Sequence, residues 1–155
     1  MADTTRQAPH EQQPAREQHP KPKQKLMSMA YIRRHPDLTP EQFYEHWEHT
    51  HGVIVKPWAE KHGMVYTQVH LRRQYKDGAQ AIGPEKRPAD GGAAAAASLD
   101  DYDGCALFEI DSIERFSAAF EDEYYKTTIE PDERRFIDKQ VGVMRVWGDV
   151  RKITI

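Results

Sequence analysis

Short apolar runs alternate with amphipathic segments along the chain, and the same order occurs twice. In the first half, Leu26–Ile32 is an apolar run of strand length. The N-cap residue Thr39 then opens a helix predicted over residues 40–49, where apolar side chains recur at helical spacing. Residues 52–63 are expected to form a loop with a short helical turn. Residues 64–71 alternate as a strand.

The second half repeats this order. Residues 103–110 have strand character, and Ser112 opens a helix that is predicted to run to about residue 120. A further helical turn is expected over residues 131–138, followed by a strand over residues 141–150. The order β-α-β-β-α-β over about a hundred residues is that of the ferredoxin-like split arrangement. The sequence therefore predicts an α+β fold in which helices cover one face of an antiparallel four-stranded sheet.

Two segments fall outside this pattern. Residues 1–24 contain no aromatic residue and no Leu, Ile or Val, so they cannot offset their ordering entropy by apolar burial. Residues 73–99 are rich in glycine and proline and include a run of five alanines. We expect residues 1–24 to be a disordered arm and residues 25–155 to form one domain, with a flexible excursion loop at about 73–99.

Alternation along the strand at residues 64–71 predicts which side chains face the helices. The more apolar set is expected under the helices: Val65, Thr67, Val69 and Leu71. The opposite set is then expected on the open face of the sheet: Tyr66, Gln68 and His70. An aromatic ring, an amide and an imidazole on an open face favour a ligand pocket roofed by a second copy of the chain.

Charge and composition exclude several classes. The chain has 155 residues with 22 Lys plus Arg, 25 Asp plus Glu and a net charge of −3, which argues against nucleic-acid binding through phosphates. The single cysteine, Cys105, excludes an internal disulfide framework and fits a reducing compartment. No apolar run has membrane-spanning length. We expect a soluble cytoplasmic protein with no nucleic-acid or membrane partner.

Several motifs, taken together, resemble one family. Residues 33–52 combine a basic, proline-containing turn, a Leu-Thr-Pro-Glu-x-Phe helix opening, a tryptophan and a closing histidine. This stretch resembles the start of EthD-domain proteins. Residues 66–70, 102–104 and 131–138 resemble a fungal subgroup of that family that acts in aromatic polyketide pathways.

The resemblance implies a dimeric α+β barrel in which two sheets pack open face to open face. Members of the fungal subgroup are assigned as decarboxylases of anthraquinone-type polyketide carboxylic acids, such as atrochrysone carboxylic acid, and work without a metal or organic cofactor. The implied partners of this chain are a second copy of itself and a small aromatic polyketide. The implied reaction is carbon–carbon lysis that releases CO₂.

We assign candidate catalytic roles to three residues. His70 and His51 are candidates for proton transfer, because imidazole titrates near neutral pH. Asp103 is a candidate for orienting an imidazole. Each has a plainer interpretation: His70 as a strand-end residue in water, His51 as a helix-end residue favoured by the dipole, and Asp103 as part of a Tyr-Asp-Gly turn.

Other residues are candidates for binding the substrate. Gln68 and Tyr66 are expected to contact its oxygen atoms. Four apolar side chains are expected mainly to pack in the core, with some of them lining the pocket: Phe108, Trp147, Trp58 and Met144. Of these, Phe108 and Trp147 are the candidate substrate contacts.

Three histidines close in sequence also suggest a metal site. His46 and His49 are three residues apart, His51 lies beyond the predicted helix end, and no carboxylate has the spacing of a His-Glu-x-x-His motif. We therefore interpret His46 and His49 as surface residues on a charged helix, and expect no metal.

The same residues suit other functions. General acid–base groups in an aromatic cavity also serve a dehydratase or a cyclase acting on a polyketide intermediate. A protein that binds and shields a reactive polyketide without catalysis is the alternative from another class.

Overall fold

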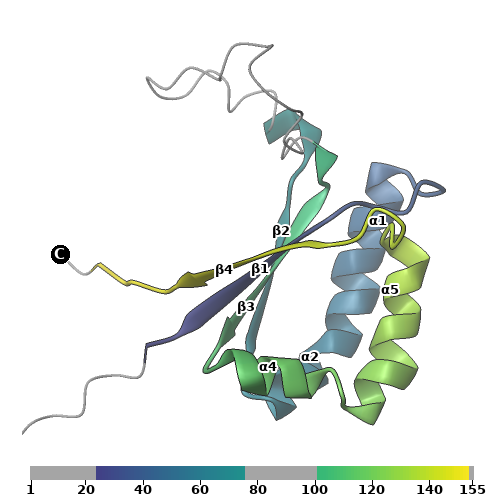
Figure 1. Ribbon diagram of the computed structural model, residues 1–155. Helices are drawn as coiled ribbons and strands as arrows, with labels where there is room; N and C mark the ends of the chain where they lie inside the picture. Colours follow the sequence, from purple (N-terminus) through teal and green to yellow (C-terminus); the bar gives the residue numbers. More distant parts are fainter. Residues whose placement is uncertain (1–23, 76–100, 154–155) are drawn as a thin grey trace, which may run out of the picture.

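The computed structural model describes residues 24–75 and 101–153, and within them a four-stranded sheet is covered by helices on one face (Figure 1). The strands are β1 (Leu26–Ile32), β2 (Val65–His70), β3 (Gly104–Ile110) and β4 (Met144–Asp149). Their order in the sheet is β2-β3-β1-β4, and every neighbouring pair is antiparallel. This is the predicted ferredoxin-like α+β arrangement. The predicted arm and most of the predicted excursion loop lie outside the described residues.

The first helical segment is longer than predicted. It consists of α1 (Pro40–His46), the π-helical segment η1 (Trp47–His51) and α2 (Gly52–Lys61). Thr39 caps it as expected: its hydroxyl accepts from the Gln42 N–H, and the Gln42 side chain accepts from the Thr39 N–H. The expected loop over residues 52–63 is therefore wrong.

Gly52 allows the helix to continue because it adopts ordinary helical dihedral angles, with φ −56° and ψ −38°. The cost of glycine in a helix is only about 1 kcal/mol relative to alanine, and burial of Val55, Trp58 and Ala59 offsets it. A Cβ at Gly52 would lie 3.1 Å from Nε2 of Gln68, so the absent side chain also makes room for that amide.

The second half contains α4 (Ile113–Ala119), the π-helical segment η3 (Tyr125–Ile129) and α5 (Glu130–Phe136). Ser112 caps α4 by accepting from the Arg115 N–H, as predicted. The turn predicted over residues 131–138 is the end of a longer helical segment that starts before η3. All of these helices lie on the same side of the sheet (Figure 1).

The side-chain alternation of β2 is the reverse of the prediction. Val65 is 59 % exposed and Val69 is 37 % exposed, whereas the indole N–H of Trp47, in the helical layer, donates to the hydroxyl of Tyr66. Tyr66, Gln68 and His70 therefore lie under the helices. The prediction was wrong because polar side chains can be buried between the sheet and the helices when they have hydrogen-bond partners there, and Trp47 supplies such partners to Tyr66 and Gln68.

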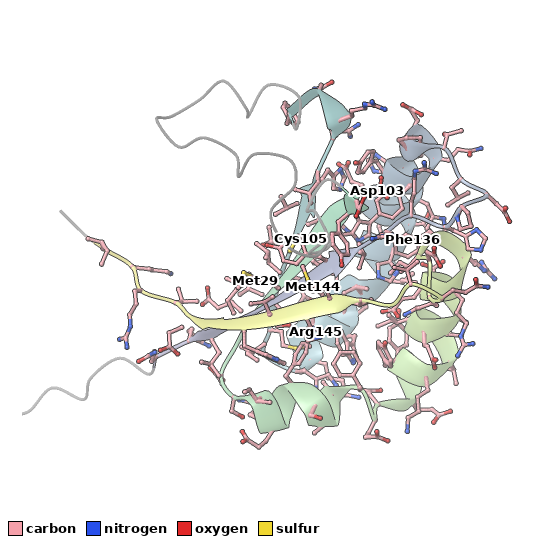
Figure 2. All side chains as sticks on the ribbon, turned by 45° about the horizontal axis from the view of Figure 1, so that its top comes forward. Met29, Asp103, Cys105, Phe136, Met144 and Arg145 are labelled. Carbon is pink, nitrogen blue, oxygen red and sulfur yellow. The ribbon has the colours of Figure 1, made fainter. Side chains whose placement is uncertain are left out.

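The core lies between the sheet and the helices. Its most completely buried large side chains come from both layers: Trp47, Phe43, Phe136, Ile110, Ile129 and Val55. In Figure 2, Phe136 lies among the helices, whereas Met29 lies on the uncovered side of the sheet.

Candidate functional site

A cavity of about 120 Å³ lies between the sheet and the helical layer. Its walls are mainly apolar and aromatic, and the sheet contributes Ala30, Ile32, Tyr66, Ala106 and Phe108. The polar groups at its walls are His51, Tyr66, Tyr125, Glu133, Lys139 and Arg145. An apolar cavity with a few convergent polar groups is the usual form of a small-molecule site.

Both π-helical segments border this cavity. Trp47 and His51 are the first and last residues of η1, and Tyr125 and Ile129 are the first and last residues of η3, and all four line the cavity. A π-helical turn widens the helix locally and is common at functional sites. Each widened turn thus presents two side chains to the same space.

His51 forms a buried pair with Asp132. Its Nδ1 lies 2.9 Å from Oδ2 of Asp132, and both residues are about 5–6 % exposed. Phe136 packs against the imidazole, with 4.7 Å between ring centroids. An ionised carboxylate accepts a hydrogen bond from the Nδ1–H group, which leaves Nε2 as the other ring nitrogen, at the cavity wall.

The same carboxylate also contacts His46. Nε2 of His46 lies 2.9 Å from Oδ1 of Asp132, and the His46 side chain is 25 % exposed. Asp132 therefore links a histidine at the cavity to a histidine that reaches solvent. Burial lowers the pKa of His51, and the hydrogen bond with Asp132 opposes that shift.

Tyr66 has an unusual hydrogen-bond arrangement. Its hydroxyl oxygen accepts from Nε1 of Trp47 at 2.9 Å and from Nε2 of Gln68 at 3.1 Å. Since these two donors occupy its two lone pairs, its own proton is directed elsewhere, and the residue lines the cavity. Burial raises the pKa of Tyr66, so it remains a neutral donor at physiological pH.

Comparison with known proteins decides the family. The EthD domain family matches residues 35–140, which is more than half of the chain. The chain belongs to the EthD domain family. No curated protein matches this EthD chain. Among solved structures, a protein of unknown function from Rhodopseudomonas palustris is similar, with 15 % identity, a TM-score of 0.46, and coverage of 85 % of this chain and 86 % of that one.

The three polar residues predicted on β2 are joined in this EthD chain by one network. Nε2 of His70 lies 3.1 Å from Oε1 of Gln68, and the Gln68 amide donates to Tyr66 and to the backbone oxygen of Trp47. The His70 ring stacks on Tyr44 and on Trp47, each at 4.9 Å between centroids. Burial lowers the pKa of His70, and the charge of Arg72 lowers it further.

Of these three polar residues of β2, only Tyr66 lines the cavity. Gln68 and His70 line an open groove beside β2, and Tyr66 lies at the wall of both the groove and the cavity. The structure therefore separates the two histidines predicted to share one pocket. His51 is at the cavity, and His70 supports Tyr66 through Gln68.

The contacts of Asp103 differ from the predicted contact with a histidine. Its carboxylate accepts from the backbone N–H of Arg34 at 2.9 Å, and its backbone oxygen accepts from the Tyr44 hydroxyl at 2.9 Å. It thus fixes the turn before β3. Asp132 is the carboxylate that contacts His51.

The two predicted substrate contacts have different positions. Phe108 lines the cavity and stacks on Tyr66, with 4.8 Å between ring centroids. Trp147 is 38 % exposed, packs edge-on against Phe116 and does not line the cavity.

The three neighbouring histidines of the EthD chain, His46, His49 and His51, have different surroundings. His49 is exposed and lies 3.8 Å from Glu45, as expected of a surface residue. His46, also expected on the surface, instead pairs with Asp132. Across residues 24–75 and 101–153, no three His, Cys, Asp or Glu side chains are grouped so that they could hold a metal ion.

Sequence reasoning missed Asp132 and the charged groups Glu133, Lys139 and Arg145. Asp132 lies in a motif that carries the family resemblance, but the sequence alone does not single out this carboxylate, because acidic residues at a helix start are common without function. In the described residues, no helix is both long and apolar enough to cross a membrane.

Proposed function

We propose that this EthD protein is a cofactor-independent decarboxylase of an aromatic polyketide carboxylic acid. The observation that carries the proposal is the buried His51–Asp132 pair at the wall of an apolar cavity that Tyr66 also lines. A β-keto or ortho-hydroxy aromatic acid loses CO₂ readily once its neighbouring oxygen is polarised. Such a reaction needs one hydrogen-bond donor to that oxygen and one proton donor to carbon.

The side chains supply both groups. The bond between the ring carbon and the carboxylate breaks, CO₂ leaves, and the electron pair moves into the neighbouring carbonyl to form an enolate. The Tyr66 hydroxyl donates a hydrogen bond to the enolate oxygen. Protonated His51 gives its Nε2 proton to the ring carbon, and Asp132 stabilises the imidazolium beforehand. Nε2 of His51 then takes a new proton from water that enters the cavity, while His46, on the same carboxylate, holds Asp132 in place.

The cavity volume limits how the substrate is bound. A cavity of ~150 Å³ holds a molecule of the size of benzene, so about 120 Å³ has room for no more than one ring. We expect the reacting ring to enter the cavity and the remaining rings to extend past Lys139 and Val143 toward solvent.

Incubation with a polyketide β-keto acid tests this function. The purified protein is expected to release one CO₂ per product, with a product mass lower by one CO₂ and turnover unchanged by a chelator. Loss of water instead would favour a dehydratase, and an unchanged mass with a new ring would favour a cyclase. Tight binding without any turnover would favour an accessory protein. Each of these three results would overturn the decarboxylase proposal.

We also propose that the open sheet face binds a second copy of the chain. The pairing of the strands places a mostly apolar set of side chains on this face: Met27, Met29, Tyr31, Val65, Val69, Leu107, Met144 and Val146. Among them, Val146 is 41 % exposed on β4. A large exposed apolar patch favours association, and identical copies usually associate symmetrically.

Sedimentation tests this dimer. The wild-type protein is expected to sediment as a dimer at micromolar concentration, and Val146→Asp is expected to shift it toward monomer. Val53→Asp, at an exposed position on α2, is the matched control and is expected to remain dimeric. A monomeric wild-type protein would refute the proposal.

A further inference from the structure

Arg145 lies on β4, an edge strand of the sheet, and its side chain is partly exposed to solvent. It pairs in register with Ala30 of β1, so its side chain lies on the helix-covered face of the sheet. Its guanidinium lies 5.2 Å from the ring centroid of Phe116 and 6.0 Å from that of Phe120, and it donates to the hydroxyl of Ser28. Figure 2 shows it on β4. Arg145 also lines the cavity.

The cavity is lined by the charged side chains of Glu133, Lys139 and Arg145. Lys139 forms an ion pair with Glu133, which also accepts from the Tyr125 hydroxyl at 3.3 Å. Within the part of the chain that the structure describes, Arg145 has a hydroxyl partner and two aromatic rings but no ion pair. Of the described charged side chains that line the cavity, Arg145 is therefore the cation that is not paired with a carboxylate.

The remaining donors of Arg145 are suited to a carboxylate. A guanidinium carries five N–H groups in a planar fork that matches the two oxygens of a carboxylate, and Ser28 uses one of them. The two rings and Ser28 hold the fork in place. Burial lowers the pKa of Arg145, and the charge of Glu133 opposes that shift.

We infer that Arg145 is the anchor for the carboxylate of the substrate, and that the cavity selects planar aromatic acids over their neutral analogues. This inference rests on the proposed function and names the residue that sets its substrate class. The ring packs against the aromatic walls while the carboxylate meets the guanidinium.

Loss of CO₂ defines how this anchor acts in catalysis. The ion pair is present with bound acid and disappears as the carboxylate becomes neutral CO₂. An interaction stronger in the ground state than in the transition state lowers KM without raising kcat. Arg145→Gln is therefore expected to raise KM while kcat is maintained or increased.

Binding of a small unreactive acid tests the anchor directly. Calorimetric titration with 2-hydroxybenzoate and with its neutral amide compares a single-ring acid with a ligand of nearly the same shape. The wild-type protein is expected to bind the acid more tightly than the amide. Arg145→Gln is expected to weaken acid binding ~10- to 100-fold, the usual effect of losing a charged hydrogen bond, and to leave amide binding unchanged.

Two further variants complete the test. Arg145→Lys is expected to bind the acid with intermediate affinity, because it keeps the charge and loses the fork. Arg151→Gln, an exposed arginine paired with Asp149 beyond the cavity, is the matched control and is expected to bind as wild type. The inference fails if the wild type binds acid and amide equally, if it binds no acid, or if Arg145→Gln binds the acid as wild type does.

The titration and the turnover assay fail independently. Selective acid binding that depends on Arg145, without CO₂ release, would keep the anchor and overturn the decarboxylase. CO₂ release with a KM that Arg145→Gln does not change would keep the decarboxylase and overturn the anchor.

Discussion

Replacing Asp132 by asparagine is expected to lower the rate of CO₂ release by ~10²-fold or more, the usual size of a general acid–base contribution. The amide retains the shape of the carboxylate but carries no charge, so it cannot stabilise the imidazolium of His51. Steady-state kinetics of CO₂ release measure the effect. His51→Ala is expected to cause a loss of similar size, because the two residues act as one unit.

The pH profile separates this role from a structural one. If protonated His51 is the proton donor, kcat should fall as the pH rises through its pKa, which burial lowers from 6.5. The hydrogen bond with Asp132 raises that pKa, so Asp132→Asn should move the falling limb to lower pH. Asp37→Asn, at an exposed carboxylate beside His35, is the control and should leave rate and profile unchanged. A normal rate in Asp132→Asn would refute the assignment.

Replacing Gly104 by alanine is expected to lower the free energy of unfolding by ~1–3 kcal/mol, as overpacking of a core usually does. A Cβ at Gly104 would lie 2.2 Å from Cζ3 and 2.5 Å from Cη2 of Trp47. That indole is 1 % exposed and has little room to move. Because Trp47 also donates to Tyr66, turnover should fall as the indole shifts.

Denaturant unfolding measures the stability change. Gly148→Ala is the matched control, since it is also a strand glycine and its Cβ would lie 3.7 Å from Cε of Met29, an ordinary contact. We expect Gly148→Ala to change stability by no more than about 0.5 kcal/mol. Equal stability of the two variants would contradict the packing of Trp47 against β3.

The order of the elements could be predicted from the sequence because each strand and each capped helix start has a local signal. Leu26–Ile32 is predicted with its observed bounds, and the caps Thr39 and Ser112 are confirmed. The helix through Gly52 could not be predicted, because burial of α2 against the sheet outweighs the local preference of a glycine to end a helix.

The site was predicted only in part, because its geometry depends on contacts between distant segments. Tyr66 is the one polar residue of β2 that reaches the cavity, and its orientation depends on the Trp47 indole. Asp132 is 81 residues from His51 along the chain. Local sequence pattern indicated Asp103 as the carboxylate that orients a histidine, and hydropathy predicted the wrong face for Tyr66. Neither signal contains information on hydrogen bonds between distant segments.

The position of bound substrate tests the central claim most directly. A crystal structure of the slow Asp132→Asn variant with the polyketide acid is expected to show the reacting ring between the sheet and the helices. There its carbonyl oxygen should lie within hydrogen-bond distance of the Tyr66 hydroxyl, and the ring carbon that bears the carboxylate should face Nε2 of His51. A substrate bound on the open face of the sheet, with this cavity empty, would contradict the account.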